Sequence, residues 1–354
     1  MNKEIIKKLG LNKLFFNNKY SARFYKLLSF IGTKKAFVSY HLRNKNIDNL
    51  IDDSIKIKEN FGKVGIILQG PLQCEDNFTY ETLKMYKKIY PNSEVILSIW
   101  KNEDKDRLEK IKGLKGIVII ENDKPETGGF INLNYQIVST KNAVLKAKEL
   151  GCKYILKSRT DIRIYETGVD KFLISLLKNF PANSSKQEQR IIGIDINTHK
   201  YGIGISDIFQ FGTIKEMEKM WNVDLVKKVT TLEEYLKFEK TSTAIDRFNF
   251  EFAECYLMKR YLSKNQIILE PTLESYYKVL KENFIIIDAS MINMYWNKYL
   301  GDEYKGWKNY DKLIARSSMA FKDWLMIYSN DVIVDEKILN LTYDEWRKKT
   351  IEEI

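Results

Sequence analysis

Short apolar runs alternate with segments of helical periodicity between about residues 62 and 160. The runs are continuous, which is typical of strands covered on both faces of a sheet. The expected strands are 64–68, 95–100, 116–120 and a run at 154–156 that leads into Arg159, and the expected helices are 78–90, 105–112 and 133–150. Strands and helices in this alternation join through right-handed crossovers. The pattern therefore predicts an α/β fold with a mostly parallel, Rossmann-like central sheet and helices on both faces.

The second half of the chain is less regular. The strands expected there are 191–196, 208–211 and 284–287, and the expected helices are 215–221, 232–240, 248–262 and a stretch near 310–328. Thr230 and Thr231 each precede a glutamate by three positions, which is the pattern of a capping box at a helix start. We expect three parts: a basic amphipathic arm at 1–60, the α/β domain at 61–300 and a helical C-terminal extension at 301–354.

Basic residues are concentrated at the N-terminal end. Residues 1–47 hold nine lysines and two arginines against one glutamate, so they carry +10 of the net charge of +11. Apolar and aromatic residues lie between these charges at helical spacing, which is typical of a helix at an anionic membrane surface. A helix that merely covers the domain, or an arm that binds nucleic acid, fits the same pattern. The nearly neutral remainder argues against nucleic acid, because such binding depends on clustered Lys and Arg.

Composition excludes several other classes of protein. No run approaches the ~20 apolar residues that a membrane-spanning helix needs, and no signal peptide is visible. We therefore expect a cytoplasmic protein, peripheral on the inner face of the cell membrane. The three scattered cysteines and two histidines favour neither a disulfide framework, nor a zinc site, nor a His-based triad.

One candidate for chemistry is Asp161, which closely follows the expected strand at 154–156. In open α/β sheets the ligand crevice lies outside the carboxyl ends of the strands. The structural alternative is an ion pair between Asp161 and either Arg159 or Arg163, because such pairs form similar clusters.

Two further polar motifs follow expected strands. Gln69-Gly70-Pro71 ends the first strand and can place backbone polar groups against a base, although a plain turn explains it equally. The motif Asn132-x-Asn134-x-Gln136 lies at the start of the long helix. It contains three amide side chains, which is more than are required to cap a helix. A helix N-terminus favours anions such as phosphate. Neither a Walker A sequence nor a G-x-G-x-x-G motif is present.

Five short blocks, taken in order, resemble the WavE family of bacterial lipopolysaccharide and capsule synthesis proteins, which are regarded as glycosyltransferases with a GT-A-like fold. The resemblance covers about residues 62–300. The blocks are Ile67-Leu68-Gln69-Gly70-Pro71, Asn132-Leu133-Asn134-Tyr135-Gln136-Ile137-Val138-Ser139-Thr140, Lys157-Ser158-Arg159-Thr160-Asp161, Ile205-Ser206-Asp207-Ile208-Phe209-Gln210-Phe211-Gly212 and Glu254-Cys255-Tyr256-Leu257.

The resemblance implies roles for individual residues. GT-A enzymes carry an Asp-x-Asp motif whose last carboxylate meets a divalent metal, and Asp161 matches that position. Arg159 stands where the first aspartate would be, so Mn²⁺ or Mg²⁺ at Asp161 is uncertain, and the guanidinium itself can meet a diphosphate. Asp207 and Glu254 are the candidate general bases, with Glu254 favoured. The donor-binding residues we expect are Gln69, Gly70, Pro71, Asn132, Asn134, Gln136, Arg159, Asp161 and Arg163.

The resemblance predicts a hexosyltransferase that moves a sugar from a nucleotide-sugar donor, with a UDP-sugar expected first, to a surface-glycan or lipid-linked acceptor. Its basic arm, residues 1–47, would hold it on the anionic membrane surface. The alternative is a non-catalytic protein that retains the fold and uses the basic arm to bind nucleic acid or to serve as a membrane adaptor.

Overall fold

The computed structural model describes residues 43, 45, 52–183, 185–227, 229–250, 252–299, 318–342 and 345. The chain divides into two compact units, Met1–Lys45 and Asn46–Ile354. Almost all of the first unit, and with it most of the predicted basic arm, lies outside the described residues. The description below concerns the second unit, and the domain boundaries at 60 and 300 stay predictions.

A seven-stranded sheet forms the centre of this unit, in the order β3-β2-β1-β4-β7-β6-β8. Only β7 runs antiparallel to its neighbours β4 and β6. The strands are β1 (Val64–Gln69), β2 (Glu94–Trp100), β3 (Ile117–Asn122), β4 (Tyr154–Arg159), β6 (Ile191–Ile194), β7 (Gln210–Thr213) and β8 (Phe284–Ile287). The predicted α/β fold with a mostly parallel central sheet is confirmed.

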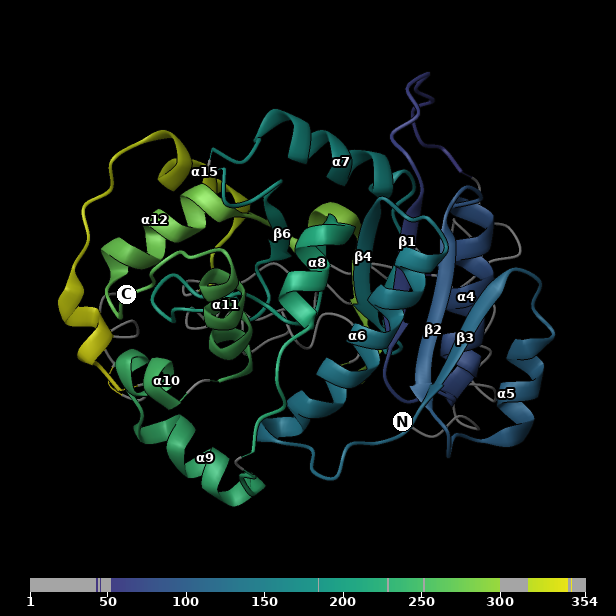
Figure 1. Ribbon diagram of the computed structural model, residues 1–354, viewed down its shortest axis with the longest axis horizontal. Coiled ribbons are helices and arrows are strands. Elements are labelled where there is room, and N and C mark those ends of the chain that lie inside the picture. Colours follow the sequence, from purple (N-terminus) through teal and green to yellow (C-terminus); the bar gives the residue numbers. More distant parts are fainter. Residues whose placement is uncertain are drawn as a thin grey trace, which may run out of the picture. The chain divides into compact units, whose positions relative to one another are not determined.

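Helices cover both faces of the sheet. The order of the strands determines which face each helix covers. From β1 to β3 the strands are added in one direction across the sheet, whereas the connection from β3 to β4 returns in the other direction. Right-handed connections therefore place α4 and α5 on one face and α6 on the opposite face. Figure 1 shows α6 in front of the sheet and α4 behind it. The helices are α4 (Phe78–Ile89), α5 (Lys105–Lys112), α6 (Leu133–Glu149), α7 (Val169–Asn179), α8 (Ile214–Trp221), α9 (Leu232–Thr241), α10 (Ala244–Phe250), α11 (Ala253–Lys264), α12 (Leu273–Asn283) and α15 (Phe321–Ser329).

Burial explains why the first four strands were predictable. Every residue of β1 is buried, as are the last six of β2. Both strands lie inside the sheet, where a continuous apolar run is required. The capping box predicted before residue 232 is present at Thr231, whose side chain and that of Glu234 each bond the other's backbone N–H.

The helix predicted at 248–262 is wrong, because two helices, α10 and α11, occupy that stretch. Phe252 leaves the helical conformation and is the N-cap of α11. Phe250 and Phe252 both pack on Phe130, with ring centroids 5.1 and 4.9 Å away. A continuous helix would point residues two positions apart in different directions, so this shared aromatic contact requires the break.

A two-stranded antiparallel sheet, β5 (Ile162–Ile164) with β9 (Met294–Trp296), was not predicted. Its register pairs Ile162 with Trp296. Both strands have three residues, too few for a periodicity to show in the sequence. Their pairing brings Trp296 beside the residues that follow β4.

The C-terminal stretch is helical at α15, within the region predicted at 310–328, of which residues 310–317 lie outside the described residues. Within the part of the chain that the structure describes, we find no helix of the length and apolarity that crossing a bilayer requires.

Candidate functional site

Candidate residues from distant parts of the chain meet at one edge of the sheet. The edge is formed by the carboxyl ends of β1, β4 and β6. Because β7 is antiparallel, its first residue lies there too, and Lys157 on β4 pairs with Gln210 at the start of β7. The loops that lead into α6 and β7 reach the same edge. This is where ligands bind in open α/β sheets.

A chain of amide side chains connects β1 to the loop before β7. Ser139 on α6 donates to Gln69 Oε1 at 3.0 Å, and Gln69 Nε2 donates to Gln136 Oε1 at 3.4 Å. Gln136 Nε2 then donates to Asp207 Oδ2 at 2.6 Å. Three residues predicted from separate motifs, Gln69, Gln136 and Asp207, therefore form one hydrogen-bonded set.

Lys157 lies fully buried beneath this set. Its ammonium donates to the backbone oxygen of Asp207 and to Gln136 Oε1, and it lies 4.6 Å from the centre of the Trp221 ring. Burial lowers the pKa of Lys157 to about 7, with the positive charge of Arg159 adding to the shift and the negative charge of Asp207 opposing it. Charged groups are rarely buried without a reason, so Lys157 is a functional candidate that the sequence analysis missed.

Glu254 and Asp207 approach each other, although 47 positions separate them in the sequence. Burial of its carboxyl group, together with the nearby charge of Asp207, raises the pKa of Glu254 to about 8. Part of the residue stays exposed, although protein atoms surround its carboxyl group. Two neighbouring carboxyl groups, one of which keeps its proton near neutral pH, can serve as a proton donor and a proton acceptor.

Close packing fixes the position of Glu254. A Cβ at Gly204 would lie only 3.0 Å from Glu254 Cβ and 3.2 Å from its carbonyl carbon, so a larger residue there would push the loop before β7 and α11 apart by a few tenths of an ångström. Asn197, which follows β6 with φ of 61°, lies near the Glu254 side chain and lowers its pKa, although burial and Asp207 outweigh this effect. Thr198 accepts from the backbone N–H of Ser206 at 3.0 Å and thereby ties the Asp207 loop to the end of β6.

Two more ionisable groups border this pair. The positive charge of Arg247 on α10 lowers the pKa of Glu254, although burial and Asp207 outweigh it. Burial and the same arginine lower the pKa of His199 to about 4, so that its ring is neutral at physiological pH. Neither residue was a sequence candidate, since an isolated Arg or His carries no spacing signal.

Asp161 forms the ion pair that was the structural alternative. Arg159 Nε and Nη2 donate to its two carboxylate oxygens at 2.8 and 2.9 Å, and Trp296 Nε1 donates to Oδ2 at 3.0 Å. Burial raises the pKa of Asp161, but the hydrogen bonds and charge of Arg159, with the Trp296 bond, hold the net pKa below its usual value.

The residues around Asp161 do not fit a divalent cation. Mn²⁺ and Mg²⁺ take oxygen ligands, whereas both Asp161 oxygens already accept from a guanidinium. Within the described ranges, no three His, Cys, Asp or Glu side chains gather at any place as metal ligands would.

The remaining predicted donor-binding residues contact protein groups. Asn134 is 1% exposed and bonds both the N–H and the C=O of Val226 and the C=O of Thr127. Arg163 is 1% exposed, bonds Thr82, Tyr165 and the Phe78 carbonyl, and lies over the Phe78 ring. These contacts favour structural roles for both.

Gly70 and Pro71 follow β1, and Asn132 precedes α6. Gly70 has φ of 118°, and Pro71 accepts a hydrogen bond from the Thr160 hydroxyl at 2.6 Å, which joins the ends of β1 and β4. Asn132 is exposed in a left-handed conformation at the start of α6. Their donor-binding roles stay predictions.

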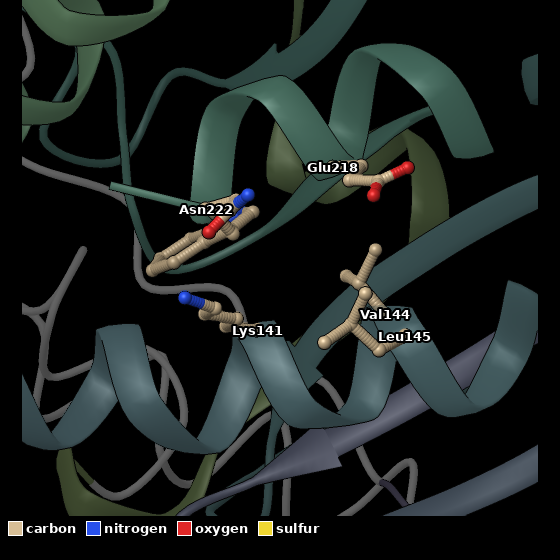
Figure 2. A pocket seen from close by; sticks show the side chains of 6 residues that line it. Lys141, Val144, Leu145, Glu218 and Asn222 are labelled. Atoms are coloured by element: carbon tan, nitrogen blue, oxygen red, sulfur yellow. The ribbon is translucent and has the colours of Figure 1, made fainter. Parts of the chain in front are cut away.

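A small hollow between α6 and α8 does not belong to this site. It has no enclosed space large enough for a water molecule and is lined by Lys141, Val144, Leu145, Glu218, Trp221 and Asn222. Figure 2 shows these side chains reaching across the seam between the two helices. None of the predicted site residues lines it, so the hollow is a packing seam.

Comparisons with known proteins identify one family. No curated protein matches it. Two solved structures are similar, each with a TM-score of 0.31: a 4-diphosphocytidyl-2C-methyl-D-erythritol synthase of Anaerococcus prevotii (15% identity, 50% of this chain and 83% of that one) and a cytidylyltransferase of Leptospira borgpetersenii (12%, 65% and 97%). The model of the family described as WavE lipopolysaccharide synthesis matches residues 64–354, which include every candidate site residue. The chain belongs to the WavE lipopolysaccharide synthesis family.

Proposed function

We propose that the chain is a glycosyltransferase that moves a sugar from a nucleotide-sugar donor, with a UDP-sugar tested first, to a glycan or lipid-linked acceptor. The observation that carries the proposal is the hydrogen-bonded set of Gln69, Gln136 and Asp207 at the carboxyl end of β1, with Glu254 packed against the loop that leads to Asp207. A sugar transfer with inversion needs a base beside the acceptor hydroxyl and a polar cradle for the leaving diphosphate. This edge offers both kinds of group within a family of lipopolysaccharide synthesis.

Glu254 is the base that we propose for this reaction. Its carboxylate accepts the proton of the acceptor hydroxyl while that oxygen forms a bond to the anomeric carbon of the donor. The bond from the anomeric carbon to the diphosphate breaks, and its electron pair leaves with the nucleoside diphosphate. Asp207, held by Gln136, keeps the Glu254 pKa high enough to make it an effective proton acceptor near neutral pH.

The donor is expected over the ends of β1 and β4, where Gln69 and Arg159 are register partners. Gln69, Gly70 and Pro71 would meet the nucleoside, while Arg159 would meet the diphosphate. The basic residues 1–47 would bring the body to an anionic, acceptor-bearing membrane surface on its cytoplasmic side.

A binding screen followed by a turnover assay tests the function. Thermal shift with UDP, GDP and CMP, with and without Mn²⁺, identifies the nucleotide, because a ligand that binds the native state stabilises it. Release of that nucleotide from its sugar conjugate then reports transfer or hydrolysis. Glu254→Gln should retain the thermal shift and lose the release, and Glu274→Gln is its control, since both glutamates lie in the first turn of a helix. A chain that binds none of these nucleotides would contradict the proposal.

A further inference from the structure

The guanidinium of Arg159 is held in one orientation at the carboxyl end of β4. Two of its N–H groups donate to the two oxygens of Asp161, which is 4% exposed. The guanidinium carbon also lies 5.6 Å from the centre of the Trp296 ring, and the indole of Trp296 donates to the same carboxylate. Paired N–H···O bonds give such a fork a fixed plane.

Backbone contacts hold this arrangement from the opposite side. Asn297 N–H donates to the Asp161 carbonyl at 2.8 Å, and Ile162 pairs with Trp296 in the β5–β9 sheet. Trp296 therefore cannot leave Asp161 without breaking that small sheet. The unpredicted pair of strands has a role in this geometry: it anchors the ring that supports Arg159 and Asp161.

A cation at Asp161 would have to displace the guanidinium. Removing one partner of a hydrogen-bonded ion pair leaves the buried charge of the other uncompensated. The lowered pKa of Asp161 shows that its carboxylate is already stabilised by the positive charge beside it. The position that a metal would occupy against this carboxylate is taken by Arg159.

The same arginine is partly exposed at this edge of the sheet. Its side chain keeps 24% of its surface exposed, compared with 6% for the Asp161 side chain. It is the register partner of Gln69, so it lies at the end of β1 as well as of β4. An anion that approaches this edge meets the guanidinium before it can reach the carboxylate.

We infer that Arg159, oriented by Asp161 and Trp296, is the cation that binds the donor's diphosphate, and that donor binding requires no divalent metal. The inference rests on the proposed function, because it assumes a nucleoside diphosphate at this edge. Asp161 then acts as a positioning residue. Arg suits the task, because its planar fork matches two phosphate oxygens at once.

Reciprocal variants separate this inference from metal binding. The affinities of UDP and GDP for the full-length chain are measured by calorimetry in EDTA and again in Mn²⁺. We expect dissociation constants that agree within about two-fold between the buffers, since a tenfold change corresponds to about 1.4 kcal/mol. Arg159→Met should weaken binding at least about tenfold. Asp161→Asn should weaken it only about two- to three-fold, because its amide oxygen still accepts from Arg159.

The controls address folding and nonspecific charge. Arg107→Met removes an exposed arginine that is also paired with a nearby aspartate, Asp104, and should leave the affinity unchanged. If Arg159→Met fails to fold because Asp161 loses its partner, the double variant Arg159→Met/Asp161→Asn removes both charges and should show the same loss of affinity.

Two results would overturn the inference. If Mn²⁺ tightens binding tenfold or more, and Asp161→Asn abolishes binding while Arg159→Met does not, a metal at Asp161 binds the diphosphate; the proposed function then stands without this inference. If a folded chain binds neither nucleotide in either buffer, the proposed function fails and the inference fails with it.

Discussion

Gln136 donates a 2.6 Å hydrogen bond to Asp207 Oδ2, and the direction of its amide is determined by its neighbours. Its oxygen accepts from Gln69 Nε2 and from the ammonium of Lys157, each at 3.4 Å. An amide whose oxygen faces two donors must turn its NH₂ group the other way. Lys157 therefore orients the Asp207 carboxylate through Gln136, and it holds the Asp207 backbone directly.

Lys157→Met should lower kcat more than it raises KM for the donor, because it releases Asp207 and not the nucleotide. A catalytic group that is displaced by about 1 Å can cost 10²-fold in rate. Lys157→Arg should not restore activity, since a guanidinium is too large for the space between Gln136 and Trp221. Steady-state kinetics on the two variants measure this, and wild-type kcat in Lys157→Met would contradict the positioning role.

The same lysine predicts a pH dependence of stability. Its ordinary pKa is 10.5, and burial lowers it to about 7 in the folded chain. Between these values the unfolded chain holds a proton that the native chain has lost, so the free energy of unfolding rises with pH, by up to about 1.4 kcal/mol per unit. Below about pH 7 both states are protonated, and the cost of burying the charge is present in full. Lys157→Met should lack this rise when urea unfolding is followed across the window, whereas the exposed Lys148→Met should retain it.

Asn134 and Gln136 lie in the same turn of α6, yet they should respond differently to alanine. Asn134→Ala leaves the N–H and C=O of Val226 and the C=O of Thr127 without their side-chain partner. The expected loss is about 1–3 kcal/mol of unfolding free energy with turnover per folded molecule retained. Gln136→Ala should lose turnover per folded molecule, because Asp207 loses its donor. The melting temperature and the steady-state kinetics are measured on one preparation of each variant. Loss of turnover in both variants would indicate that Asn134 belongs to the donor site.

The sheet was predictable because it is buried on both faces. The buried strands are therefore almost entirely apolar, as residues 64–68 and 95–97 show, and such continuous runs can be recognised in the sequence. Gln69, Gln136, Asp207 and Glu254 were found because polar residues after strands and at helix starts have a recognisable position. The prediction did not give their mutual contacts, which depend on the antiparallel insertion of β7 between β4 and β6.

Lys157 and Trp296 show what local pattern cannot reveal. A lysine within a strand is indistinguishable in the sequence from one that reaches solvent, and its burial follows from Trp221 and α6 packing over β4. Trp296 belongs to a strand of three residues whose partner lies more than 130 positions away. The environments of both residues result from tertiary packing, which leaves no local pattern in a single sequence.

The basic arm supplies a separable prediction. The chain divides at Lys45, and residues 1–47 carry +10 of the net charge of +11. Deleting residues 1–45 should abolish sedimentation with anionic liposomes and leave nucleotide release intact, because the described site residues lie in the second unit. Neutral liposomes serve as the control, since the attraction to anionic lipid is worth about 1 kcal/mol for each basic residue near the surface. Liposome binding that persists after the deletion would place the membrane contact elsewhere.

The pH profile of turnover distinguishes which carboxyl is the base. Glu254 must lose its proton to act, and its pKa is raised to about 8 by burial and by Asp207. If Glu254 is the base, kcat/KM rises with pH up to about 8, and Glu254→Gln costs about 10²–10⁴ in rate at every pH. Asp207→Asn removes a negative charge beside Glu254, so the pKa of Glu254 falls and the acid limb of the profile moves to lower pH.

The opposite assignment gives a different pattern for the same variants. If Asp207 is the base, Asp207→Asn abolishes turnover at every pH. No pH profile of kcat/KM then remains in which a shift of the acid limb could be measured. Stability supplies an independent reading of the Glu254 proton. A carboxyl whose pKa rises from 4.5 to about 8 on folding contributes stability that is present below pH 4.5 and is lost as the pH rises towards 8. The unfolding free energy of Glu254→Gln should therefore rise relative to that of the parent chain between pH 4.5 and 8. If the two free energies change with pH at the same rate, Glu254 ionises normally and Asp207 does not raise its pKa.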